Sequence, residues 1–522
     1  MLNNIRPYIT RDEPFGPIDS GDIDSSDLKA LLMLFEKHNL IYKNLRSRPS
    51  IIIGRRGSGK TYYLRSVFFD EQYDYFVEIR VPRVLAQVAR AIQRLSAEVV
   101  FSELVSELWD TILWISVFLE IRKHSILPAD DLNVVNGYLD KMRVRENDTV
   151  EDALRNVAHM LEEIVSKNSA SDVDILWRAD KISLDDAKAV VLKSLDASGK
   201  KFAILMDSLD DFQLDIDSVA RSLQGLLKIV GSMNKPRDVV DIRFCLPSEL
   251  YHRFIKLSSN PNKDFRRALK LQWTASELVL IGAQRLMFHL ILHYPEFNKR
   301  YSSLDLTRRA DALTLFQAVL PEKITNHVGY QEDTMSYILR HTQLLPRHFL
   351  ILLNSIFKNR GATARLTPFP VSAERIVTGI RQMEEFIVGE IFVAFKLIHP
   401  TAEEVCKRCL PELGHQFTMG DLHRVFTRHG KAVFGSDNLF DFQRMLLEIG
   451  AIGRVIPGKE TDVYIKGNFE YTVQHQLSLS QDDELCIHPL FSGIYHGSGR
   501  KDRPVYPYGS VLDDEDYRNG EE

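Results

Sequence analysis

Residues 54–61, Gly-Arg-Arg-Gly-Ser-Gly-Lys-Thr, constrain this chain more than any other segment. They match the pattern G-x-x-x-x-G-K-[ST] of phosphate-binding loops. Glycines let the backbone curl until successive amide N–H groups point into one concavity, which binds anionic oxygens. A helix predicted to begin at the end of the loop adds the positive end of its dipole. The residues expected to bind a nucleotide are Gly54, Gly57, Ser58, Gly59, Lys60 and Thr61.

The residues on either side of the loop support this interpretation. Three isoleucines at 51–53 precede it, as in a buried parallel strand, and residues 62–69 follow with helix-compatible apolar spacing. The alternative is a glycine- and arginine-rich surface turn. A chance match in a chain this long has a probability of roughly 2%, so we favour the phosphate loop. Lys60 would then contact the β- and γ-phosphates, and the Thr61 hydroxyl would bind Mg²⁺.

A second motif is an apolar run at residues 202–206 that ends in Asp207. A central parallel strand has this pattern, with functional groups at its C-terminal end. Many buried strands end in aspartate at a turn, but the phosphate loop makes a catalytic interpretation strong. Asp207 is expected to hold Mg²⁺. Either Asp210 or Asp211 is expected to orient or deprotonate the attacking water, and the sequence does not choose between them.

Together these motifs resemble those of STAND-type ATPases, a signalling branch related to the AAA+ ATPases. The resemblance extends over roughly residues 27–357 and points to a bacterial P-loop ATPase of the STAND/AAA+, initiator-like branch. It implies an α/β P-loop core, with a parallel sheet and helices on both faces, that binds ATP and Mg²⁺ and hydrolyses ATP slowly. Residues 239–247 resemble the sensor strand that follows the Walker B acid in these families.

The resemblance also makes four arginines candidate contacts. Arg243 lies on the sensor-like strand, and Arg266 and Arg267 occupy the place of an arginine finger that faces a neighbouring subunit. Arg347 resembles the lid arginine that contacts the γ-phosphate in AAA+ proteins. Each has a simpler alternative. Arg243 would be a solvated edge residue, Arg266 or Arg267 a charged surface step, and Arg347 a helix-start arginine paired with an acid.

The chain is expected to divide into five regions. Far more sequence separates Lys60 from Asp207 than a minimal core needs, so the core is expected to carry a large insertion. The insertion would either offer a partner-binding surface or pack on the core as scaffolding. The expected regions are an N-terminal helical lead-in at 1–50, the ATPase core at 51–275 with a helical insertion at about 84–195, a helical lid at 276–365, a winged-helix-like domain at 366–496, and an acidic, disordered tail at 497–522.

Composition limits the classes of function. Lys plus Arg number 66 and Asp plus Glu number 71, so the net charge of −5 gives no global basic footprint for nucleic acid. Four cysteines are too few for a disulfide scaffold, and Cys406 and Cys409 are interpreted as buried thiols rather than a zinc site. The most apolar helix candidate, Thr111–Leu119, is too short to cross a bilayer. We therefore expect a cytoplasmic protein without a membrane partner.

The resemblance implies a nucleotide-driven switch that forms a homo-oligomer or engages a separate effector protein, with antiphage defence as one expected setting. The alternative is an initiator- or loader-like ATPase that grips duplex DNA through the winged helix. Basic and acidic residues are interleaved through residues 419–466, a pattern more typical of a solvated face than of a DNA groove reader. A third possibility is a nucleotide-locked scaffold that barely hydrolyses ATP.

Overall fold

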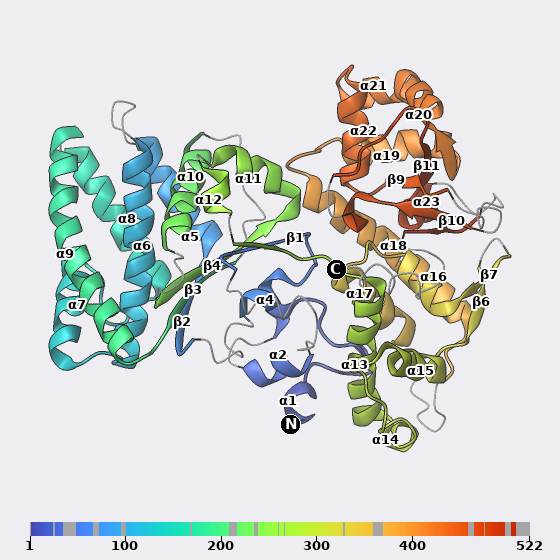
Figure 1. Ribbon diagram of the computed structural model, residues 1–522, viewed down its shortest axis with the longest axis horizontal. Helices are drawn as coiled ribbons and strands as arrows, with labels where there is room; N and C mark the ends of the chain where they lie inside the picture. The colour runs from blue at the N-terminus through green and yellow to red at the C-terminus, as the bar shows by residue number, and fades with distance from the viewer. Residues whose placement is uncertain are drawn as a thin grey trace. The chain divides into compact units, whose positions relative to one another are not determined.

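The computed structural model of the chain (Figure 1) comprises two compact units. The core unit contains residues 41–55 and 60–271, and the C-terminal unit contains residues 1–40, 56–59 and 272–522. The structure describes residues 2–23, 27–34, 49–65, 73–94, 101–167, 170–207, 217–233, 239–258, 260–265, 267–326, 329–358, 369–457, 464–473, 476–495 and 503–507. Three candidate site residues therefore lie outside the described residues: Asp210, Asp211 and Arg266.

A five-stranded parallel sheet forms the centre of the core unit, in the order β2-β3-β4-β1-β5. Strands β1, β3 and β4 are buried along nearly their whole length, which is why their sequences are almost continuously apolar. The predicted α/β core with a parallel sheet is thus confirmed. The strands are β1 (Ile51–Gly54), β2 (Tyr75–Arg80), β3 (Phe202–Asp207), β4 (Val240–Pro247) and β5 (Ala268–Lys270).

Helices cover both faces of this sheet. Helix α4 (Lys60–Arg65) packs against β1, β3 and β4, whereas α10 (Asp217–Met233) packs against β4, and Figure 1 shows them on opposite sides. An ion pair of 3.1 Å between Arg65 and Glu78 ties α4 to β2. The remaining short helices of the sheet region are η3 (Ser248–Leu250), α11 (Tyr251–Leu257) and α12 (Pro261–Asp264).

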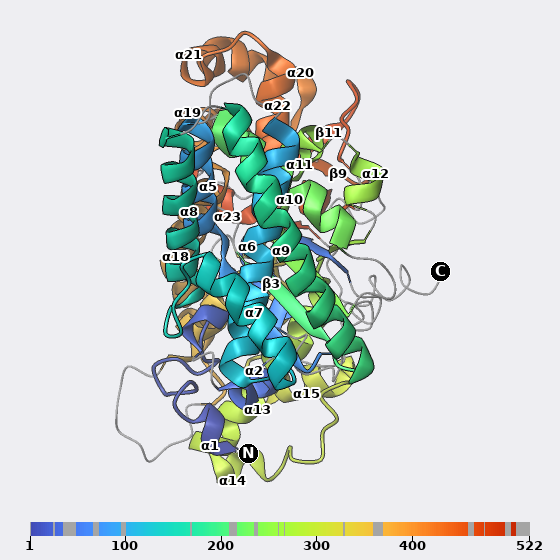
Figure 2. The ribbon, with the colours of Figure 1, turned by 90° about the vertical axis from the view of Figure 1, so that its left-hand side faces the viewer.

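Among the described residues, the elements of the insertion between β2 and β3 are all helices, as predicted, and they begin directly after the unpredicted strand β2. Its helices lie side by side in Figure 2. The buried Trp109 indole donates a hydrogen bond of 2.8 Å to the carbonyl of Ser222 on α10, so this part of the insertion is scaffolding on the core. The helices are α5 (Val81–Arg94), α6 (Phe101–His124), α7 (Ala129–Lys141), α8 (Val150–Lys167) and α9 (Ala170–Ala197).

The C-terminal unit is built around the long apolar helix α13. Thr274 and Glu277 form a capping box that starts this helix. Buried Arg285 donates to the carbonyls of Phe15 and Pro17 at 2.8 and 2.7 Å, which fixes the N-terminal segment. The helices are α1 (Leu2–Ile5), η1 (Ser20–Asp22), α2 (Leu28–Leu34), α13 (Ala275–His293), α14 (Pro295–Asn298), α15 (Arg309–Val319), α16 (Thr334–Arg340), α17 (Pro346–Phe357) and α18 (Ala373–Phe395), with a hairpin of β6 (Lys323–Thr325) and β7 (Gln331–Asp333).

Helix α13 corrects the expectation that no apolar helix is long enough to cross a bilayer. With 19 residues and a hydropathy of 1.4, it is by length and composition the one such helix in the part of the chain that the structure describes. Its buried residues nevertheless include Arg285 and His289. Because α13 packs among α14, α15 and α17, it is a core helix of this unit.

The rest of the C-terminal unit combines short helices with a second five-stranded sheet, in the order β12-β10-β9-β11-β8. One hydrophobic cluster joins residues from Ala275 to Phe491, so the expected lid and winged-helix-like regions share a core. The elements are α19 (Ala402–Cys409), η4 (Leu410–Glu412), β8 (Gln416–Thr418), α20 (Met419–Val425), a π-helical turn (Phe426–Gly430), α21 (Lys431–Phe434), α22 (Leu439–Glu448), β9 (Ile452–Val455), β10 (Ile465–Asn468), η6 (Glu470–Thr472), β11 (Glu484–Ile487), α23 (Pro489–Tyr495) and β12 (Val505–Tyr506).

Two details of this region bear on the sequence predictions. Strand β12 lies within the segment expected to be a disordered tail. Two contacts hold it in place: Val505 pairs with Ile465, and the buried Tyr506 hydroxyl donates to Glu332. Cys406 and Cys409 are buried thiols on α19, as predicted. Burial raises the pKa of Cys409 to about 11, which keeps the thiol protonated and unreactive.

Gly225 provides a test of the packing between α10 and α6. A Cβ added there would lie 2.6 Å from Val105 Cγ1 and 3.1 Å from its carbonyl carbon. We expect Gly225→Ala to lower the free energy of unfolding by about 1–3 kcal/mol through overpacking. In Gly137→Ala, the matched control at an exposed position of α7, an added Cβ meets nothing within 4 Å and should stabilise the fold by up to about 1 kcal/mol. Urea midpoints that fall equally, or not at all, would contradict this packing.

His289 predicts a pH dependence of stability. Burial, with the charges of His293 and Arg11, lowers its pKa from 6.5 to about 3. As the pH falls below 6.5 the unfolded chain takes up this proton first, so stability is lost between pH 6.5 and about 3, by about 1.4 kcal/mol per pH unit. We expect His289→Phe to flatten urea-midpoint profiles over this window. A profile as steep as that of the wild type would show that other groups dominate.

Candidate nucleotide-phosphate site

The predicted phosphate loop connects the end of β1 at Gly54 to the start of α4 at Lys60. Gly57 and Gly59 have φ angles of +84° and +85°, in the left-handed region where a Cβ is strained. The two glycines thus supply the curl that the sequence motif predicts. Because α4 begins directly at Lys60, its free N–H groups lie at the end of the same loop.

Lys60 is held against this loop. Its ammonium nitrogen donates a hydrogen bond of 3.2 Å to the carbonyl oxygen of Arg55, and the residue is 7% exposed. Since a lysine ammonium has three donors and no acceptor, two remain for anionic oxygens near the loop. The arrangement therefore places a positive charge beside the backbone that is expected to bind phosphate.

Asp207 is at the same edge of the sheet. The strands are parallel, so the C-terminal ends of β1 and β3 point the same way, with β4 between them. Helix α4, which carries Thr61, contacts β3 as well as β1. A hydroxyl and a carboxylate are oxygen donors of the kind that Mg²⁺ prefers. Thr61 and Asp207 would therefore suit a Mg²⁺ ion at this edge, and its binding stays a prediction.

Sequence reasoning did not identify two further polar residues at this edge, Ser248 and Glu249. They follow Pro247, which pairs directly with Gly54 at the start of the phosphate loop. The Ser248 hydroxyl donates to the Glu249 carboxylate at 3.4 Å. Their signal in the sequence is a pair of polar residues immediately after an apolar strand. They add a hydroxyl and a carboxylate to the same edge of the sheet as Asp207.

Two of the candidate arginines, Arg243 and Arg267, are described residues of the core unit, and both lie away from this edge. Arg243 is 2% exposed and its guanidinium lies over the ring of Tyr73, 5.4 Å from the centroid, so it is no solvated edge residue. It precedes the end of β4 by four residues, roughly 13 Å. Arg267 lies at the opposite edge, where its carbonyl accepts from the amides of Ser50 and Ile51. Its role as an arginine finger stays a prediction.

Arg347 contacts the loop through its main chain and its aliphatic stem. Its amide donates to the carbonyl of Gly57 at 3.3 Å, and a Cβ at Gly57 would lie 3.0 Å from the Arg347 Cβ. The guanidinium pairs with Asp19 and, at 3.6 Å, with Glu390. The simpler alternative, pairing with an acid, is thus present in the structure, whereas a contact with nucleotide stays a prediction.

Trp273 is a second contact to the loop that sequence reasoning missed. Its indole Nε1 donates a hydrogen bond of 2.9 Å to the carbonyl of Ser58, 215 residues away in the chain. The sequence carries only a weak signal for this role, a tryptophan immediately before the helix cap Thr274. Two consecutive carbonyls of the phosphate loop are therefore bound by residues of the C-terminal unit, to which residues 56–59 also belong.

Comparison with known proteins adds little to this geometry. No protein-family model matches the chain, and no curated protein matches its sequence. Among solved structures, the chain is similar to an Aeropyrum pernix ORC2 protein, solved in ADPNP-ADP complexes. The two are 12% identical, the match covers 90% of this chain and 93% of that one, and the TM-score is 0.36. A superposition this poor says nothing about ligand or function, which rest on the geometry described above.

The two loop glycines predict different responses to substitution. Alanine in the left-handed region costs roughly 1–2 kcal/mol at either position. Gly57→Ala must also displace the Arg347 side chain, whereas a Cβ at Gly59 meets nothing within 4 Å. We therefore expect Gly57→Ala to lower the urea midpoint more than Gly59→Ala. Equal midpoints for the two variants would show that Arg347 does not pack on the loop.

Proposed function

We propose that the protein binds ATP with Mg²⁺ at residues 54–61, hydrolyses it slowly and acts as a nucleotide-driven switch. The observation that carries the proposal is the loop itself, in which two left-handed glycines lead into Lys60 beside the strand edge that bears Asp207. A surface turn can also use left-handed glycines, but it would leave its lysine exposed, whereas Lys60 is buried.

The chemistry follows from the positions of these groups. Lys60 and the amides of residues 57–61 bind the phosphate oxygens, and Thr61 and Asp207 hold the metal ion. Mg²⁺, when bound, neutralises charge on the transferring phosphoryl group. The water is oriented by a carboxylate, for which Asp210 and Asp211 are the candidates from sequence and Glu249 is added by its place after β4. Phosphoryl transfer is mostly positioning, so no covalent catalyst is required.

The switch itself is the less direct part of the proposal. Support comes from the C-terminal unit, whose Arg347 and Trp273 bind the carbonyls of Gly57 and Ser58, so a ligand that orders the loop also orders these contacts. Homo-oligomerisation, a separate effector protein, a cytoplasmic location and a role in antiphage defence rest on the STAND resemblance alone. The winged-helix character of residues 366–496 also stays a prediction.

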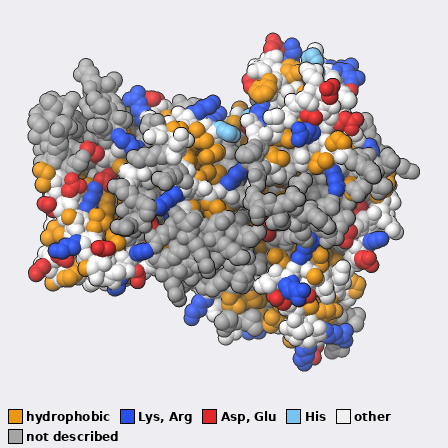
Figure 3. Space-filling view, in the orientation of Figure 1, with side chains coloured by type: hydrophobic (Ala, Val, Ile, Leu, Met, Phe, Trp, Pro, Cys, Tyr) orange, Lys and Arg blue, Asp and Glu red, His pale blue; other side chains and the backbone are white. Residues whose placement is uncertain are grey.

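The DNA-binding alternative gains no support from charge. Four of the basic residues of this region, Arg424, Arg428, Lys431 and Arg444, pair with acids, for example Arg424 with Asp421 and Lys431 with Asp437 at 3.3 Å. Figure 3 shows acidic and basic side chains interspersed over the face in view. Because counterion release grows with the number of phosphates that Lys and Arg neutralise, these paired and interspersed charges favour the switch over the initiator-like reader.

Calorimetric titration with ATP and Mg²⁺ tests the proposal. We expect Lys60→Ala to weaken ATP binding at least tenfold, because the charge against the loop is lost. We expect Asp207→Asn to retain ATP binding but lower hydrolysis at least tenfold through loss of the metal ligand. The matched control is Lys299→Ala, whose ammonium pairs with exposed Glu296 and should leave both properties unchanged.

The same variants test the switch by mass in solution. Light scattering with and without ATP should show nucleotide-dependent assembly in the wild type and in Lys299→Ala, but not in Lys60→Ala. Wild-type protein that binds no ATP would overturn the whole proposal. Tight ATP binding without any change in mass would leave the ATPase and remove the oligomeric switch. Rapid turnover by the isolated chain would contradict slow hydrolysis.

A further inference from the structure

The middle of the phosphate loop is fixed by two hydrogen bonds to consecutive carbonyls. The amide of Arg347 binds the oxygen of Gly57, and the indole of Trp273 binds the oxygen of Ser58, at 3.3 and 2.9 Å. The cis peptide found among the described residues is Phe369-Pro370, so the loop peptides are trans. In a trans peptide the carbonyl and the following N–H point in opposite directions.

The orientation of two amides follows from this geometry. Fixing the Gly57 carbonyl directs the N–H of Ser58 away from Arg347, and fixing the Ser58 carbonyl directs the N–H of Gly59 away from Trp273. Successive N–H groups on one side of a loop form an anion-binding nest. Because glycine backbones are permissive, the peptide plane between Ser58 and Gly59 would otherwise rotate more freely. The two external donors therefore constrain the orientation of the Ser58 and Gly59 amides.

The two donors are of different kinds. The Arg347 amide belongs to the first turn of α17, which starts at Pro346 without a side-chain cap, so Gly57 satisfies one of its free N–H groups. Trp273 instead donates through its side chain. Only the second interaction can be removed by substitution without altering the backbone of a helix.

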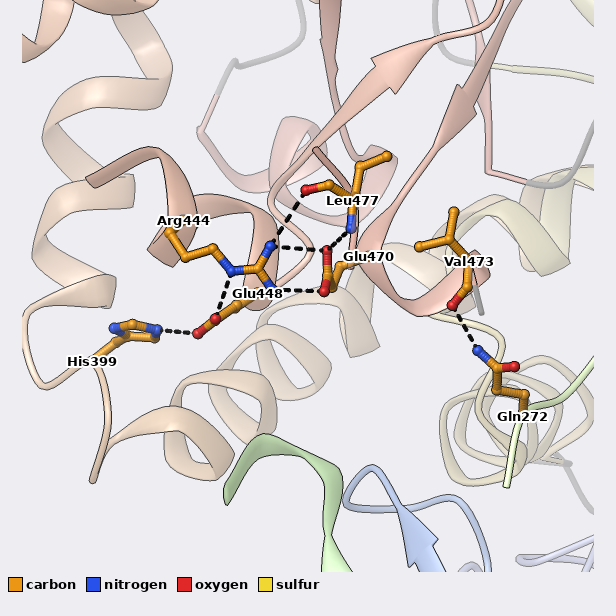
Figure 4. A network of polar contacts seen from close by, with 7 residues as sticks. All are labelled: Gln272, His399, Arg444, Glu448, Glu470, Val473 and Leu477. Carbon is orange, nitrogen blue, oxygen red and sulfur yellow. Dashed lines mark hydrogen bonds and ion pairs between the residues drawn. The ribbon is translucent and has the colours of Figure 1, made fainter. Parts of the chain in front are cut away.

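Trp273 is itself held on both sides along the chain. Thr274 forms the capping box of α13 with Glu277. The side-chain amide of Gln272 donates a hydrogen bond of 2.9 Å to the carbonyl of Val473. Figure 4 shows Gln272 reaching Val473 close to the ion pair of Arg444 with Glu470. A residue anchored at both neighbours can hold a peptide plane with little loss of entropy on binding.

We propose that Trp273 is a positioning residue for phosphate, whose indole N–H orients the Ser58–Gly59 peptide so that the Gly59 amide faces the anion. This inference rests on the proposed nucleotide binding and deepens it. The indole orients an amide that binds phosphate, and it has no role at the base or the sugar. The contribution of Trp273 is therefore the same for a nucleotide and for a bare polyphosphate.

The test measures calorimetric affinities for ATP with Mg²⁺ and for inorganic pyrophosphate with Mg²⁺. Trp273→Phe keeps an aromatic ring and removes the donor. We expect it to weaken both ligands by about 5- to 20-fold, the loss of one hydrogen bond that orients a binding group. Gln272→Ala, the matched control, loses the bond to Val473 and retains the indole, so it should weaken both ligands clearly less than Trp273→Phe does.

Each outcome distinguishes this inference from the proposed function. Wild-type protein that binds neither ligand overturns both. Normal pyrophosphate binding by Trp273→Phe overturns the positioning role, and weakened ATP binding alone would assign Trp273 to the base or sugar. An equal loss in Gln272→Ala would show general loosening of the C-terminal unit, which also overturns it.

A measurement on the wild type covers the case in which Trp273→Phe does not fold. The chain has four tryptophans, so ¹⁵N-tryptophan labelling gives four indole N–H signals. Saturating pyrophosphate should shift one of them, because ordering the Ser58 carbonyl changes the hydrogen bond that the indole donates. Four unmoved signals, with pyrophosphate bound, would overturn the inference.

Discussion

The left-handed backbone of Gly57 and Gly59 is the constraint on which the candidate site depends. At φ angles of +84° and +85° the chain turns back within a few residues, so that β1 can end at Gly54 and α4 can begin at Lys60. A side chain at either glycine would strain that turn. The position of Lys60 against the Arg55 carbonyl, and of Thr61 one residue further, follows from the turn.

Much of the core could be predicted from the sequence because its signals are local. Apolar runs at 51–53 and 202–206 become buried parallel strands, and helical spacing after Val84 becomes the helical insertion. The left-handed backbone of Gly57 and Gly59 agrees with the loop motif, which specifies backbone conformation as well as side chains, and phosphate binding there stays a prediction. Strand β2 was missed because polar residues interrupt its apolar ones, as in Tyr75-Phe76-Val77-Glu78-Ile79-Arg80.

Most of what the sequence could not provide is long-range. One alternative for Arg243 was a solvated edge residue, but its guanidinium lies over the ring of Tyr73, which comes from a distant segment. Tyr506 lies in the segment expected to be a tail, but its hydroxyl donates a hydrogen bond to Glu332, which is 174 residues away in the chain. Trp273 lies 215 residues from the carbonyl that it binds. Periodicity and motif spacing describe one segment at a time, so contacts between segments that no motif links are invisible to them.

These long-range contacts give the loop a property that a phosphate motif alone lacks. Because Arg347 and Trp273 bind consecutive carbonyls of residues 57 and 58, the loop amides and the contacts of the C-terminal unit share the same peptide planes. Under the proposed phosphate binding, linkage would work in both directions: phosphate would order these peptide planes, and contacts that order the planes would strengthen phosphate binding. Gln272 and Trp273, adjacent in the chain, attach to Val473 and Ser58 respectively. A change at the carbonyl of Ser58 is therefore connected to Val473 through two neighbouring residues and two hydrogen bonds.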